Sequence, residues 1–311
     1  MIVRSAPVVL VSALIALCGS VRSAAGQWVP SAGTGSVTVA VQRIDHTGHR
    51  VTDGTLFANG QSVNVSLYFA IDYALTDRWM VSAALPYVFG KYLDPEPPPP
   101  FIPFLPVDAC RCWNGSVQDF DVTAYYNVAN GAFALTPSIS VGVPSHDYAY
   151  RGEAVVGRRL RELRLAIDAG QRLDLISDRL SVSGQYAYAI VERVLDIPNN
   201  RSNGTVGLSF QVASKLSTRG LLSWQRTHGG LRAGSPPPAA LTLPGEVNTP
   251  ERLEQHDRLL RDNSLRLGAS AKYQFPRLDV VVSYLGFVDG TDTHAGRAFT
   301  VGIIWPFELG Q

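Results

Sequence analysis

The sequence predicts an all-β fold, a transmembrane antiparallel up-and-down β-barrel of about twelve strands. Three observations predict it: long runs in which apolar and polar side chains alternate, an N-terminal segment typical of export, and connections that differ regularly in length. No later segment is apolar enough for a transmembrane helix, so we expect any membrane crossing to use strands.

The N-terminus has the organisation of a secretory signal peptide. Arg4 precedes an apolar run from Ala6 to Leu17, and small residues lead up to residue 27. The run is shorter than the roughly 20 residues of a spanning helix, which argues against a retained anchor. A lipoprotein site at Cys18 is disfavoured because Leu17 occupies the position where a small residue is expected. We therefore expect residues 1–26 to be removed and residues 27–311 to form the barrel.

The clearest strand covers residues 61–75. Apolar side chains occupy every second position from Val63 to Leu75, with mostly polar or small residues between them. Because successive side chains of a strand point to opposite faces, this segment has one apolar and one polar face. A soluble strand averages about 5–6 residues, whereas a strand that crosses a bilayer needs about 9–11. The pattern therefore indicates a membrane-crossing strand.

Eleven further segments are predicted as strands by the same alternation. The twelve predicted ranges are 34–44, 61–75, 78–91, 117–129, 131–143, 159–173, 179–192, 204–215, 218–228, 264–275, 277–288 and 296–307. Short turns alternate with long connections, as in outer-membrane barrels, which have short periplasmic turns and longer external loops. A soluble β-sandwich, the alternative fold, seldom sorts its loops in this way. The predicted long connections are 45–60, 92–116, 144–158, 193–203, 229–263 and 289–295.

Two of the long connections, 92–116 and 229–263, are rich in proline. Proline removes hydrogen-bond donors from a ladder, so both are expected to be loops. Residues 251–260 could form one or two helical turns. This segment could lie over the barrel mouth, fold inward as a plug, or belong to a mobile external loop. Cys110 and Cys112 form either a local disulfide or two free thiols, because a metal site needs more ligands than these two.

The inner face of the predicted barrel carries polar side chains. Asp119 and Asp121 lie on the fourth predicted strand and Arg266 on the tenth, half a turn away, so we expect an acidic wall to face a basic wall. Such an arrangement produces a field across a pore. The alternative is that these side chains solvate the lumen or pair with neighbours such as Arg164. The candidate pore-lining residues are Asp72, Asp119, Asp121, Arg164, Asp168, Gln185, Gln211, Arg266 and Lys272.

Composition and the remaining motifs bear on partners and activity. Loss of Arg4 and Arg22 with the signal peptide changes the formal net charge from +1 to −1, which argues against a nucleic-acid partner. His228 is the candidate for a lipid hydrolase on the outer wall, but no serine follows it at the short spacing of that pattern. The other histidines show no metal-binding spacing. We expect no enzyme, no cofactor and no metal; the expected partners are outer-membrane lipid and small-molecule solutes.

Several stretches resemble the outer-membrane porin family named for the meta-pathway of phenol degradation. Residues 76–78 with Val81–Tyr87 resemble its second hairpin, and Leu135–Pro144 resembles its middle strand. Pro144-Ser145-His146 replaces the Pro-Thr-Gly that usually ends that strand. The resemblance extends over most of the mature chain and implies a channel in the outer membrane of a Gram-negative bacterium, without catalytic residues. The expected function is passage of small solutes, including aromatic or weakly polar compounds; the alternative is a structural or adhesive barrel whose external loops bind a partner.

Overall fold

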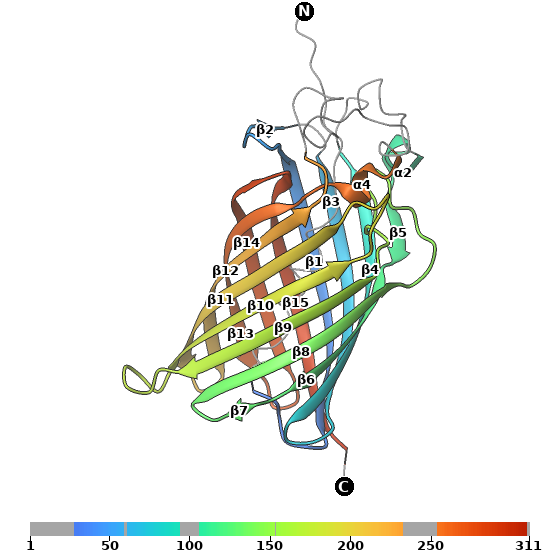
Figure 1. Ribbon diagram of the computed structural model, residues 1–311. Coiled ribbons are helices and arrows are strands. Elements are labelled where there is room, and N and C mark those ends of the chain that lie inside the picture. Colours follow the sequence, from blue (N-terminus) through green and yellow to red (C-terminus); the bar gives the residue numbers. More distant parts are fainter. Residues whose placement is uncertain (1–27, 59–60, 94–105, 153, 233–253, 310–311) are drawn as a thin grey trace, which may run out of the picture.

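The computed structural model is an all-β, closed antiparallel barrel (Figure 1). It describes residues 28–58, 61–93, 106–152, 154–232 and 254–309. Apart from the short β2, β5 and β7, twelve strands form the wall in the order of the chain. The elements are β1 (Thr34–Arg50), β2 (Leu56–Phe57), β3 (Ser62–Ala74), β4 (Trp79–Tyr92), α2 (Pro106–Ala109), β5 (Asn114–Val117), β6 (Asp119–Tyr126), β7 (Ala129–Asn130), β8 (Phe133–Pro144), β9 (Glu162–Arg172), β10 (Leu180–Val191), β11 (Asn199–Ala213), β12 (Leu216–Gly229), α4 (His256–Leu259), β13 (Asn263–Gln274), β14 (Asp279–Thr291) and β15 (Thr293–Glu308).

The barrel closes between its first and last strands. β1 pairs with β15 from Thr34 opposite Glu308 to Arg50 opposite Thr293. This pairing leaves the sheet without a free edge, which is the condition for a strand-built structure in lipid. Both strand ends near the termini lie at the end of the barrel with short turns, and we call the opposite end the long-loop end.

The outer face of the wall is apolar. On β3, Phe69 and Ile71 are 44% and 47% exposed, whereas Asn64 and Ser66 are completely buried inside the barrel. The same alternation on the other strands produces a continuous set of exposed apolar side chains, which hydrocarbon would cover. The predicted faces of residues 61–75 are therefore confirmed. No helix in the described part of the chain is long and apolar enough to span a membrane.

Two of the predicted long connections are wrong. β11 begins at Asn199, so its connection to β10 covers only residues 192–198, and a single residue, Asp292, joins β14 to β15. The start of β11 is polar on both faces, which hid its strand character. The start of β15 contains residues typical of turns, although its backbone pairs with β1. The connections consequently do not alternate strictly in length.

The long-loop end is closed by chain folded into the barrel. We define the cap as residues 145–152, 154–161 and 254–262. Val155 and Val156 pack with Tyr148 against inward-facing wall residues such as Ile44 and Val88. A second cluster joins Leu160 to Leu259 and Leu260 of the cap and to wall residues. The helical turns predicted for 251–260 are present as α4, and Leu259 is fully buried, so this segment covers the mouth instead of lying in an external loop (Figure 1).

Candidate functional site: a capped chamber

A chamber of about 910 Å³ lies inside the barrel, below the cap. Its lining combines two kinds of surface. Tyr68, Met80 and Ile304 contribute apolar groups from β3, β4 and β15. Charged side chains line the part formed by β6, β9, β11 and β12: Asp119, Asp121, Glu162, Arg164, Arg201 and Arg219. The chamber can therefore contact both an apolar ring and a polar substituent of the same small molecule.

Four of the charged side chains form a ladder of alternating sign. Arg164 lies 3.6 Å from Asp121 and 3.6 Å from Glu162. Glu162 also forms an ion pair with Arg201, and all four side chains are at most 15% exposed. Burial of charges is tolerated only when they are paired, so the ladder is a coupled unit.

The ladder spans β10 because β10 has small side chains there. Ala189 lies between Arg201 and Arg164 in the strand register and is fully buried. Its methyl group leaves space above β10, and the Arg201 guanidinium crosses this space to reach Glu162. Arg201 was not predicted as a site residue because it lies in the range 193–203, which was assigned to a loop.

Six of the nine predicted pore-lining residues line the chamber: Asp72, Asp119, Asp121, Arg164, Asp168 and Gln185. Gln185 donates a hydrogen bond to Asp168 over 2.8 Å, and Ser36 donates one to Asp72 over 3.3 Å.

The other three predicted residues lie outside the lining. Gln211 donates to the carbonyl of Ala213 at the short-turn end, and Lys272 lies 3.3 Å from Asp279, which does line the chamber. Arg266 is buried but does not line the chamber. Asp121 therefore has Arg164 as its partner, and the predicted opposition of an acidic wall to Arg266 is not the arrangement seen.

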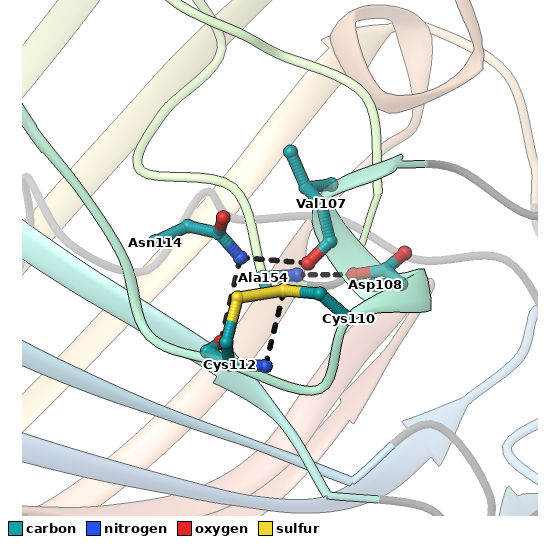
Figure 2. The surroundings of a disulfide bond; sticks show 6 residues. All are labelled: Val107, Asp108, Cys110, Cys112, Asn114 and Ala154. Carbon is teal, nitrogen blue, oxygen red and sulfur yellow. Dashed lines mark hydrogen bonds between the residues drawn. A yellow bond between two sulfur atoms is a disulfide. The ribbon is translucent and has the colours of Figure 1, made fainter.

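Buried carboxylates hold the cap. Asp257 accepts a hydrogen bond from the backbone N–H of Gly152 over 2.6 Å, and Asp108 accepts one from Ala154 over 2.8 Å (Figure 2). Both carboxylates are more than nine-tenths buried. Hydrogen bonds to charged groups are stronger than neutral ones, each contributing about 1.5–3 kcal/mol. The Asp108 bond attaches the middle of the cap to α2, and the Asp257 bond joins two segments of the cap to each other.

A tyrosine joins the cap to the charged part of the chamber. Tyr148 donates a hydrogen bond to Asp119 of β6 and accepts one from the backbone N–H of Arg159 over 2.9 Å. Burial, reinforced by the nearby Asp119, raises the pKa of the Tyr148 phenol above its usual range. The hydroxyl therefore remains a donor to Asp119 at neutral pH.

The segment that carries Asp108 is tightened by a disulfide. Cys110 and Cys112 are bonded to each other, and the Asn114 side chain donates to the carbonyl of Val107 over 2.7 Å (Figure 2). The local disulfide is therefore the correct one of the two predicted alternatives. Among the described residues, no group of three potential ligands is placed to hold a metal ion.

Three histidines predicted in external loops lie in strands. His46 and His49 belong to β1, which extends to Arg50, and His294 belongs to β15. The His294 ring lies 4.6 Å from each of the other two rings, and all three are buried. They pack beneath the cap as part of the wall.

The N-terminal segment narrows the short-turn end. The Trp28 indole donates to the carbonyl of Gly131 over 3.0 Å. A Cβ atom on Gly170 of β9 would lie 2.5 Å from the Trp28 ring, so the indole packs directly on the strand backbone. Val29 is buried beside Met80, and the next residues of the segment line the chamber.

We expect Trp28→Ala to widen this mouth. Loss of the indole frees the face of Gly170 and weakens the attachment of the segment, which exposes the chamber to small reagents from this side. A cysteine placed at Ser36, which lines the chamber, should react with a water-soluble maleimide several-fold faster in the Trp28→Ala background. An unchanged rate, with Trp113→Ala as the control, would show that the segment does not restrict access.

Comparisons with known proteins identify the type of fold. No family model matches the chain, and no curated protein matches it. The COG4313 outer membrane channel from Pseudomonas putida F1 is similar over 90% of this chain and 98% of that chain, with 11% identity and a TM-score of 0.65. Two weaker similarities are to the KdgM porin in complex with disordered oligogalacturonate (9% identity, 87% and 99% coverage, TM-score 0.46) and to the TodX ΔS2S3 mutant monoaromatic hydrocarbon channel (9%, 98% and 96%, 0.44). The first of these similarities shows that the fold is that of an outer-membrane barrel.

Proposed function

We propose that the protein is a channel in the outer membrane of a Gram-negative bacterium and carries small solutes, with aromatic or weakly polar compounds as the preferred class. The observation that carries the proposal is a lined chamber inside a closed barrel whose outer face is apolar. In this proposal residues 1–26 are removed during export, the long-loop end is external and the short-turn end is periplasmic.

The chamber supports this solute class. Its volume of about 910 Å³ falls in the range of about 300–1,000 Å³ that is typical of small-molecule pockets. Tyr68, Met80 and Ile304 offer apolar contacts, while the charged ladder offers hydrogen bonds and a local field. The resemblance to the porin family named for the meta-pathway of phenol degradation supports a channel but does not fix its substrate. A purely apolar solute would leave the buried charges without new partners, so some polarity is favoured.

The closed cap gives the main alternative its support. A barrel that remains capped would have a structural or adhesive role, with the external loops as the binding surface. Transport therefore requires the cap to move, and uptake measurements distinguish the two functions.

Liposome swelling tests the channel directly. We expect liposomes that contain the protein to admit phenyl glucoside faster than glucose, because only the phenyl group can use the apolar part of the chamber. Raffinose, which is larger, should be admitted more slowly than either. Protein-free liposomes provide the baseline. Swelling no faster than this baseline for all three solutes would reject the channel and favour the structural alternative.

A further inference from the structure

A polar cluster lies on the outer face of the wall, near the external ends of β10, β11 and β12. The Ser202 hydroxyl lies 2.7 Å from Nε2 of His228 and 3.1 Å from the Tyr186 hydroxyl. In the strand register Ser202 is opposite Arg226, and Asn200 is opposite His228. All five side chains point away from the chamber, because they share the parity of the exposed residues of their strands.

The cluster lies at the depth of the lipid headgroups. Below it, Val206 and Leu222 are exposed apolar residues, and Trp224 follows on β12. Aromatic side chains favour the boundary between hydrocarbon and headgroups. Tilted strands rise about 2.5 Å per residue, so Arg226 lies about 5 Å beyond Trp224, where the phosphates of the outer leaflet begin.

Arg226 differs from the arginines elsewhere on the outer face. Arg43 and Arg297, near the external ends of β1 and β15, both pair with Asp45, at 2.8 and 3.7 Å. Within the described part of the chain, Arg226 forms no such ion pair with a carboxylate. The adjacent connection contains Glu192 and Asp196, and Glu192 accepts a hydrogen bond from the backbone N–H of Arg161. Arg226 is therefore an exposed cation on the outer face without a carboxylate partner among the residues that the structure describes.

We infer that this cluster binds the phosphate group of an outer-leaflet lipid. The Arg226 guanidinium supplies planar donors that suit a phosphate. His228, held in place by Ser202, supplies a second donor, and the ring edge of the half-exposed Tyr186 contacts the upper part of an acyl chain. The inference needs the barrel to lie in an outer membrane but does not need it to be a channel.

The same pair of side chains suggests lipid hydrolysis, which the geometry disfavours. Ser202 is only 8% exposed and lies beneath the groups that bind it, so an ester carbonyl has little access to Oγ. Acyl transfer also needs preorganised donors for the oxyanion. The backbone around Ser202 is already engaged with β10 and β12. Binding without cleavage is therefore the favoured chemistry.

Native mass spectrometry of the purified protein in dodecyl maltoside micelles tests the inference. We expect bisphosphorylated lipid A to remain bound to the wild-type protein. Arg226→Gln with His228→Gln should weaken this binding about tenfold, because the double variant lacks both the Arg226 charge and the His228 imidazole donor. Dephosphorylated lipid A should bind the wild-type protein about as weakly as bisphosphorylated lipid A binds the double variant. Inorganic phosphate should fail to compete at equal concentration, which separates a lipid site from a free-phosphate site.

Matched variants make the result specific. Arg43→Gln removes an exposed cation of similar depth that already has an acidic partner, and it should leave lipid binding unchanged. Arg226→Lys keeps the charge and should retain most of the binding, which also controls for folding. The inference would be overturned if the double variant bound lipid A as well as the wild-type protein does. It would also be overturned if Arg43→Gln lost as much lipid A binding as the double variant. Release of fatty acid from phospholipid that is abolished by Ser202→Ala would replace it with a hydrolase.

Discussion

Simultaneous replacement of Asp108 and Asp257 by alanine is expected to open the cap and to raise conductance in planar bilayers. Each carboxylate accepts a hydrogen bond from the cap backbone while buried. Loss of Asp108 frees the cap from α2, and loss of Asp257 separates two segments of the cap. Together these losses remove about 3 kcal/mol that favours the closed cap, which shifts the balance between closed and open states roughly 100-fold. If the protein is a channel as proposed, we therefore expect the wild-type protein to be closed most of the time and the double variant to be open in most recordings.

Asp53→Ala is the matched control for this experiment. Asp53 is an exposed carboxylate at the same end of the barrel. Its side chain accepts a hydrogen bond from the backbone N–H of Thr55, a neighbour in its own loop. Its replacement should leave the open probability unchanged. If the double variant conducted no more than the wild-type protein while its barrel stayed folded, the cap could not be the main barrier to conduction.

The wall of the barrel was predictable because lipid and lumen impose a period of two on each strand. Phe69 and Ile71 are exposed on β3 for the same reason that Asn64 is buried. The prediction failed where both faces of a strand lie in polar surroundings. Near Arg201 both faces of β11 carry polar residues, so no alternation remains.

The cap could not be predicted because its contacts join segments far apart in sequence. Gly152 and Asp257 are separated by 105 positions in the sequence, and nothing in their local sequences indicates the bond. One signal was present: Ala154-Val155-Val156 is an apolar run within a predicted external loop, and its burial inside the barrel removes it from water. The partner of His228 was missed for a similar reason, since Ser202 lies on the neighbouring strand.

Glu162→Gln is expected to produce the largest loss of stability among substitutions in the chamber. The carboxylate lies between Arg164 and Arg201, and its neutralisation leaves two buried guanidinium groups with reduced compensation. Removal of one partner from a buried ion pair costs about 3–5 kcal/mol. Urea unfolding in micelles, followed by tryptophan fluorescence, should show a loss of this size. The excess positive charge should also shift the reversal potential toward anion selectivity.

A double-mutant cycle separates this coupling from a local defect. Arg201→Gln in the Glu162→Gln background removes one of the uncompensated cations, so the double variant should be more stable than Glu162→Gln alone. Asp72→Asn provides a control, because its partner Ser36 is neutral and its loss leaves no buried charge behind. If the two substitutions in the ladder were additive, Glu162 and Arg201 would stabilise the barrel independently, and the ladder would not act as a coupled unit.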